Sequence, residues 1–144
     1  MPYWRLHYHL VWSTAARQPL ITPAREAIIH QTMYAKAREL GVTIHAVGGV
    51  EDHVHAVVSM PPTLNVSECV KRFKGASARA VNIDDASGSL FRWQEGYGAL
   101  TVGGRSLASV VDYVSNQKAH HSRGTLLAPY ERSGEATERE KQSS

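Results

Sequence analysis

The stretch VTIHAVGGVEDHVHAVVSM (residues 42–60) decides the fold of this chain. Residues 42–50 and 53–60 are each rich in β-branched and other apolar side chains, which is typical of strands. Gly48 and Gly49 predict a bulge or turn, and the prolines that follow residue 60 end the second segment. The two segments are therefore predicted to pair as a hairpin.

A strand and a helix are predicted before this hairpin. Residues 3–13 are aromatic and β-branched with partial alternation, which favours a strand. Thr22 is a favourable N-cap and Pro23 a favourable first helical residue. The helix continues to about Leu40 and ends at Gly41, a residue type that commonly terminates helices.

A second helix and a broken strand are predicted after the hairpin. Asn65 or Ser67 caps the helix, which a loop at residues 82–89 follows. The strand comes in two pieces, at residues 91–93 and 99–102, because a glycine-containing segment separates two apolar runs.

A third helix is predicted to open at Ser106, to cover residues 107–121 and to end at Gly124. The order of elements is then β-α-β-β-α-β-α. The first six elements fit an α+β fold, namely a ferredoxin-like (RRM-like) antiparallel sheet with helices on one face. The seventh is an additional C-terminal helix that carries Tyr113.

Composition places the chain among ordinary globular proteins that carry a modest basic excess. The 144 residues contain 42% hydrophobic and 20% charged residues, with a net charge of +3, and suffice for one domain. We expect that domain at residues 1–125, with a polar, flexible tail at 126–144. The lone cysteine, Cys69, excludes an internal disulfide and a cysteine-rich zinc site. No membrane span or signal-peptide core is evident, so a cytoplasmic location is expected.

His53 and His55 form a candidate metal-binding pair in the second strand of the hairpin. Side chains alternate across a strand, so both imidazoles point to one face and Val54 points to the other. A second pair with the same spacing, His7 and His9, occurs in the first strand. No residue elsewhere in the sequence is evident as a partner for that second pair, whereas the first pair has one in the third helix.

The third helix brings polar groups together beside an apolar stripe. The stripe follows the i, i+3, i+4, i+7 spacing of a buried helix face and consists of Leu107, Val110, Val111 and Val114. Tyr113 and Gln117 are one turn apart at the margin of this stripe, and His120 continues the same edge. These side chains are therefore expected at the border between core and solvent, where a phenol can serve as a nucleophile.

Five blocks of sequence, taken together, resemble the single-tyrosine HUH transposases of the IS200/IS605 type, including their REP-associated relatives. In chain order they are YHLVWST (8–14), DHVHAVVSM (52–60), VKRFKGAS (70–77), WQEGYGALTV (93–102) and YVSNQKAHH (113–121). The resemblance covers about residues 3–125. Leu100 and Thr101 replace the usual Phe and Ser, and Gly103-Gly104 follows where other residues are more common, which suits a hinge before the third helix.

The resemblance implies a DNA strand transferase with Tyr113 as nucleophile. It implies His53, His55 and Gln117 as ligands of a divalent metal, and this mixed N/O donor set suits Mg²⁺ or Mn²⁺. The substrate implied is single-stranded DNA, with hairpins at element ends, and the product of cleavage is a 5′-phosphotyrosine. The chain is expected to form a homodimer in which the tyrosine helix can act in trans.

The second helix is the candidate DNA-binding element. Its apolar residues face the core, which leaves a set of basic residues for phosphates: Lys71, Arg72, Lys74 and Arg79. Four aromatic residues are candidates for stacking on bases, although core packing is the commoner role: Trp4, Trp12, Trp93 and Tyr97.

Two other functions stay open at this point. The chain could be a non-catalytic nucleic-acid-binding module on a ferredoxin-like sheet, which would need no metal. It could also be a metal-dependent phosphohydrolase in which water attacks in place of Tyr113. The first predicts that His53→Ala changes nothing, and the second predicts that no covalent protein–DNA species forms.

Overall fold

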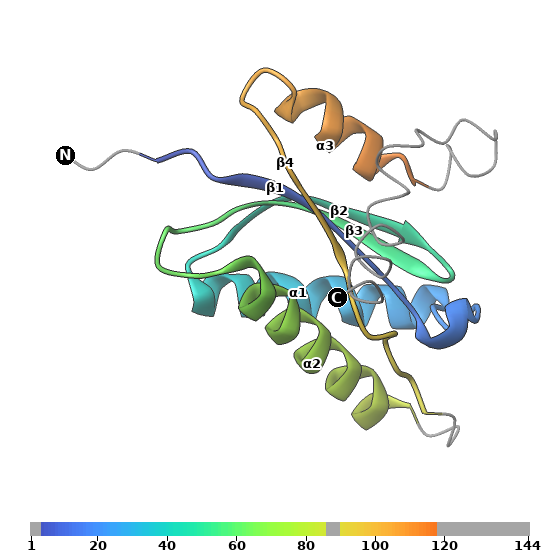
Figure 1. Ribbon diagram of the computed structural model, residues 1–144. Coiled ribbons are helices and arrows are strands. Elements are labelled where there is room, and N and C mark those ends of the chain that lie inside the picture. The colour runs from blue at the N-terminus through green and yellow to red at the C-terminus, as the bar shows by residue number, and fades with distance from the viewer. Residues whose placement is uncertain (1–3, 86–89, 118–144) are drawn as a thin grey trace, which may run out of the picture.

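The computed structural model describes residues 4–85 and 90–117, which form an antiparallel sheet covered on both faces by helices (Figure 1). Within these residues the sheet has four strands in the order β2-β3-β1-β4. Their bounds are β1 (His7–Ser13), β2 (Thr43–Val50), β3 (His53–Ser59) and β4 (Gly98–Thr101). All neighbouring strands are antiparallel, as a ferredoxin-like fold requires.

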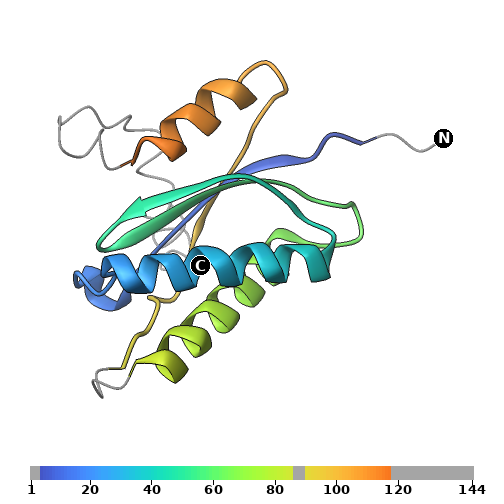
Figure 2. The same ribbon diagram turned by 180° about the vertical axis from the view of Figure 1, so that it is seen from behind.

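The helices are divided between the two faces of the sheet. Both long helices, α1 (Pro23–Leu40) and α2 (Val66–Asp84), lie on one face, and α3 (Leu107–Ser115) lies on the other. The reverse view in Figure 2 shows the same two layers. The predicted fold class, with a separate C-terminal tyrosine helix, is thus confirmed. No helix in the described part of the chain is long and apolar enough to cross a membrane.

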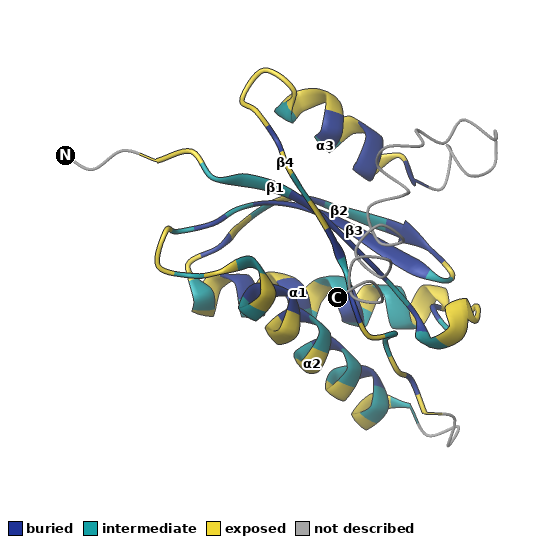
Figure 3. Cartoon of the chain, viewed as in Figure 1, coloured by how far each residue is buried: buried dark blue, intermediate teal, exposed yellow. Residues whose placement is uncertain are grey.

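The main core lies between the sheet and the α1–α2 layer, and Figure 3 colours residues of both as buried. Leu10 and Trp12 of β1 point into this core, and Trp12 packs against Phe73 of α2 with 6.3 Å between ring centroids. Burial of each such large apolar side chain stabilises the fold by roughly 1.5–3 kcal/mol. Because side chains alternate along a strand, His7, His9 and Val11 belong to the opposite face.

Helix ends follow the local signals in the sequence. The side-chain oxygen of Thr22 accepts a hydrogen bond from the Arg25 amide at 3.2 Å, and Gly41 ends α1 with a left-handed φ of 72°. Asn65, rather than Ser67, caps α2, because its Oδ1 accepts from the Glu68 amide at 2.8 Å.

Two predictions about the strands are wrong. Gly48 and Gly49 are regular residues of β2, and the irregularity in strand pairing lies between Ile44 and Ala46. The first strand starts at His7 rather than at residue 3.

The regions around residues 82–93 and after residue 117 also differ from expectation or lie outside the description. Helix α2 extends to Asp84, because the Asn82 side chain holds the backbone N–H and carbonyl of Phe91 at the end of this helix. The piece at 91–93 contributes only a bridge between Trp93 and Thr14. The predicted end of the third helix at residues 118–124, together with His120 and the tail at 126–144, lies outside the described residues.

Candidate active site

The two histidines of β3 lie on the α3 side of the sheet. His53 and His55 are 2% and 0% exposed, and their ring centroids are 5.0 Å apart. Val54, between them, packs into the main core on the other side. The alternation expected of a strand therefore brings two imidazoles together on one face, as the sequence predicts.

Tyr113 reaches His55 from α3 of the same chain. Its ring centroid is 6.1 Å from that of His55, with the rings at 81° in an edge contact. Tyr113 and Gln117 are only 3% and 1% exposed, so their predicted position at the border between core and solvent is wrong. The margin of the apolar stripe faces the sheet, where a small second core buries Val57, Val110 and Val114 around Tyr113.

Gly48 permits this close approach of α3. A Cβ at this position would lie 2.0 Å from the backbone oxygen of Val114 and 3.6 Å from Cβ of Gln117. Gly48 is also the residue of β2 that pairs with His55 of β3. The C-terminal end of α3, with Gln117 just beyond it, therefore sits over the strand pair that contains His55.

Both histidines are held through their Nδ1 atoms. His53 Nδ1 lies 2.7 Å from Oδ1 of Asp52, and His55 Nδ1 lies 2.7 Å from Nε2 of His9. Nε2 is then the ring nitrogen with which each histidine can bind a metal. Two imidazoles and one carboxamide fit a divalent cation that keeps open positions for a substrate. Within residues 4–85 and 90–117, no group of three His, Cys, Asp or Glu side chains is placed to hold a metal ion.

The histidines at positions 7 and 9, for which the sequence indicates no partner in a metal site, make hydrogen-bond contacts instead. His7 Nδ1 lies 2.6 Å from the hydroxyl of Ser59, and His45 Nε2 lies 2.5 Å from the same hydroxyl. Burial, and secondly the charge of His7, lower the pKa of His45. His9 contacts His55 instead, so the two histidines of this pair contact different residues. The sequence does not show this, because the contacts depend on how β1 aligns with β3.

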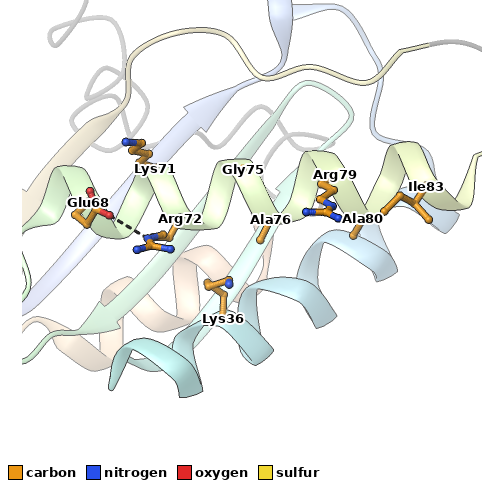
Figure 4. A pocket seen from close by; sticks show the side chains of 9 residues that line it. All are labelled: Lys36, Glu68, Lys71, Arg72, Gly75, Ala76, Arg79, Ala80 and Ile83. Atoms are coloured by element: carbon orange, nitrogen blue, oxygen red, sulfur yellow. Dashed lines mark hydrogen bonds and ion pairs between the residues drawn. The ribbon is translucent and has the colours of Figure 1, made fainter.

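A basic groove lies on the opposite side of the molecule, between α1 and α2 (Figure 4). Its volume is about 640 Å³. Three of the four predicted DNA-binding residues line it, namely Lys71, Arg72 and Arg79. Lys36 of α1 adds a fourth cation that sequence reasoning missed, since nothing local indicates that α1 packs beside α2. Two of these cations are paired with carboxylates: Arg72 Nε lies 3.0 Å from Oε1 of Glu68, and Lys36 Nζ donates to Oε2 of Glu39 at 2.7 Å.

Lys74, the remaining predicted DNA-binding residue, is placed differently. Its ammonium group donates to the carbonyls of Gln94 and Gly96 at 2.7 and 3.1 Å, which ties α2 to the segment before β4. Among the aromatic candidates for base stacking, Trp12 is buried in the core, and Trp93 and Tyr97 pack against it. Trp4 is 49% exposed.

Comparison with known proteins identifies the family. The family model described as "Transposase IS200 like" matches residues 2–117. The chain belongs to the IS200-like transposase family. Membership implies DNA cleavage and strand transfer as the class of activity.

Individual IS200-like transposases resemble the chain along most of its length. The ISDra2 transposase TnpA of Deinococcus radiodurans is 26% identical over 121 residues, which cover 79% of this chain and 85% of the relative. The transposase for insertion sequence element IS200 of Salmonella typhimurium is 25% identical over 135 residues, covering 88% and 87%.

Solved structures agree with the fold of an IS200-like transposase. A crystal structure from D. radiodurans R1, of a protein assigned as a transposase, has a TM-score of 0.63 at 26% identity and covers 81% of this chain and 93% of its own. The structure of a REP-associated tyrosine transposase bound to a REP hairpin has a TM-score of 0.65 at 14% identity, covering 88% and 76%. At this low identity the second likeness shows the fold alone.

Proposed function

We propose that this transposase cuts and rejoins single-stranded DNA through a 5′-phosphotyrosine intermediate, with Tyr113 as the nucleophile. The observation that carries the proposal is the meeting of Tyr113 with His55 on one buried face of one chain, 6.1 Å between ring centroids. The phenol can supply the nucleophile, and the candidate metal-binding pair can supply a site for an ion that stabilises the charge on the phosphate.

The proposed reaction conserves the energy of the phosphodiester bond. The Tyr113 oxygen loses its proton and attacks phosphorus, the bond from phosphorus to the 3′ oxygen breaks, and the leaving oxygen takes up a proton as a 3′-OH. A later 3′-OH attacks the phosphotyrosine, which releases Tyr113 and joins the new ends. Each step exchanges one ester for another, so no ATP is needed.

The proposed ligands of a divalent metal are His53, His55 and Gln117, with Mg²⁺ or Mn²⁺ as the ion. When bound, the ion would polarise the scissile phosphate and stabilise the charge on its oxygens. The residues of this chain supply the rest. His53 and His55 offer their Nε2 atoms from a rigid strand, α3 carries Tyr113, and Gln117 follows just beyond the end of this helix.

We propose single-stranded DNA with hairpin ends as the substrate. A REP hairpin is bound by a protein of the same fold, which supports this choice. The groove lined by Lys36, Lys71, Arg72 and Arg79 has the charge and shape to hold a phosphate backbone. Lys74 was predicted to share this task, but we now assign it to the link between α2 and β4, since it donates to two backbone carbonyls there.

A gel assay for a covalent adduct tests the reaction. Wild-type protein, incubated with single-stranded hairpin DNA and Mg²⁺ or Mn²⁺, is expected to give a slower protein–DNA band under denaturing conditions. Tyr113→Phe should abolish this band and keep DNA binding. Tyr34→Phe is the matched control, because Tyr34 is an exposed residue of α1 and should leave the band unchanged. Cleavage without any adduct would instead favour hydrolysis by water, and binding without cleavage would favour a non-catalytic module.

A homodimer that exchanges tyrosine helices is also proposed. Tyr113 and its neighbours are buried, so α3 must move before DNA can reach them, and the exposed Gly103-Gly104 before this helix can act as a hinge. Mixing Tyr113→Phe with His53→Ala protein tests the exchange. Restored adduct formation means that the two chains complete one site, and no restoration means that each chain works alone.

A further inference from the structure

His9 is a buried polar residue that has no part in the proposed chemistry. It is 0% exposed, and it lies on the same face of the sheet as His55. The His9 and His55 rings lie nearly parallel, with centroids 4.9 Å apart and planes at 23°, and Nε2 of His9 lies 2.7 Å from Nδ1 of His55. Antiparallel pairing places His9 opposite Val57 and Val11 opposite His55, so the two histidines meet diagonally across β1 and β3.

The 2.7 Å distance requires one proton between the two ring nitrogens. A neutral imidazole carries a single ring proton, and the nitrogen that binds a metal must lack it. If His55 binds through Nε2, its proton is on Nδ1 and is donated to Nε2 of His9. His9 is then the acceptor and carries its own proton on Nδ1.

We propose that His9 is a positioning residue that fixes the tautomer and ring orientation of His55, so that Nε2 of His55 is presented to the metal. This inference rests on the metal site of the proposed function. His53 is held in the same manner by Asp52, at 2.7 Å from its Nδ1. Each proposed histidine ligand thus has its own acceptor, one a carboxylate and the other a neutral imidazole.

The use of a neutral acceptor has a physical reason. A phosphodiester carries a negative charge, and a buried carboxylate in the place of His9 would repel it in surroundings of low dielectric. An imidazole accepts the same hydrogen bond without adding that charge. His9 therefore orients His55 at no electrostatic cost to the binding of DNA.

Three variants separate positioning from packing. His9→Phe keeps a ring in the space but cannot accept a hydrogen bond. His9→Gln keeps an acceptor, because the glutamine amide oxygen can take the place of Nε2. His7→Phe is the matched control, since His7 lies two residues away on the same face and contacts Ser59 instead of His55.

Two measurements on DNA-free protein at pH 8 read out the effect. Nitrogen-15 NMR of the histidine rings should show His55 protonated on Nδ1 in wild type, His7→Phe and His9→Gln, and changed in His9→Phe. Calorimetric titration with Mn²⁺ should show affinity weakened about 10- to 100-fold in His9→Phe, as for other outer partners of metal ligands. His9→Gln should recover most of it, and circular dichroism confirms that each variant is folded.

The outcomes distinguish this inference from the function on which it rests. A folded His9→Phe protein with wild-type Mn²⁺ affinity and an unchanged His55 spectrum would overturn the role of His9 and leave the metal site standing. Wild-type protein that binds no Mn²⁺ would overturn the metal site itself. If His9→Phe does not fold, the NMR spectrum of wild-type protein decides. A His55 proton on Nε2 rejects the proposal, and a His55 proton on Nδ1 upholds it.

Discussion

Substitution of Gly48 by alanine should separate the tyrosine helix from the sheet. The new Cβ would lie 2.0 Å from the backbone oxygen of Val114, whereas ordinary contact begins at 3.4 Å, so α3 must withdraw by about 1.4 Å. The neighbour is backbone and cannot rotate away. Overpacking of this kind costs about 1–3 kcal/mol of unfolding free energy. Because Gly48 pairs with His55, the movement also takes Tyr113 and Gln117 away from the histidines, and a displacement of ~1 Å can reduce a catalytic rate by about 10²-fold.

Urea unfolding and the rate of adduct formation on hairpin DNA measure the two effects. Gly75→Ala is the matched control for the unfolding measurement alone, because no atom lies within 4 Å of a Cβ there, whereas the residue lines the proposed DNA-binding groove. It should stabilise the protein by roughly 0.5–1 kcal/mol. If Gly48→Ala protein matched wild type in both stability and rate, the reasoning about how α3 docks would be refuted.

Further substitutions and treatments also have expected outcomes. Lys71→Ala should reduce the slope of log affinity for DNA against log salt concentration by about 1, because one phosphate contact in the groove is lost. Lys74→Ala should instead lower the free energy of unfolding, because the carbonyls of Gln94 and Gly96 lose a charged donor. Burial raises the pKa of Cys69 to about 12 from 9.0, so alkylation by iodoacetamide at pH 8, followed by mass spectrometry, should be at least about a thousandfold slower in native than in unfolded protein. The stabilisation from the neutral Cys69 thiol is present below pH 9 and is lost as pH rises toward about 12, which urea unfolding at several pH values can check. Replacing Gly103 and Gly104 together by alanine should not lower the melting temperature, because neither Cβ meets a close atom, but should slow adduct formation by stiffening the link to α3; an unchanged rate would argue against a hinge.

Local features of the fold were predictable because they depend on neighbours in the sequence. Thr22, Gly41 and Asn65 act at helix ends through their own side chains or backbone angles, and the alternation at His53 and His55 follows from strand geometry alone. These signals gave the order of elements and the histidine pair.

Features that depend on how elements meet were not predictable in the same way. The contact of His9 with His55 requires the register of β1 against β3, and the burial of Tyr113 requires knowing which face of α3 meets the sheet. The sequence predicts a bulge or turn at Gly48, whereas in the structure its missing side chain leaves room for the backbone of Val114, more than sixty positions later. Lys36 enters the basic groove only because α1 packs beside α2.

The sheet also acts as a partition. Side chains that alternate along β1 and β3 project alternately into the layer with the histidines and into the layer beneath α1 and α2. If the basic groove binds DNA as proposed, an exposed substitution on the outer surface of α2 can alter the affinity for DNA while the spacing of the imidazoles on the far side of the sheet stays fixed. The two surfaces can therefore change independently of each other.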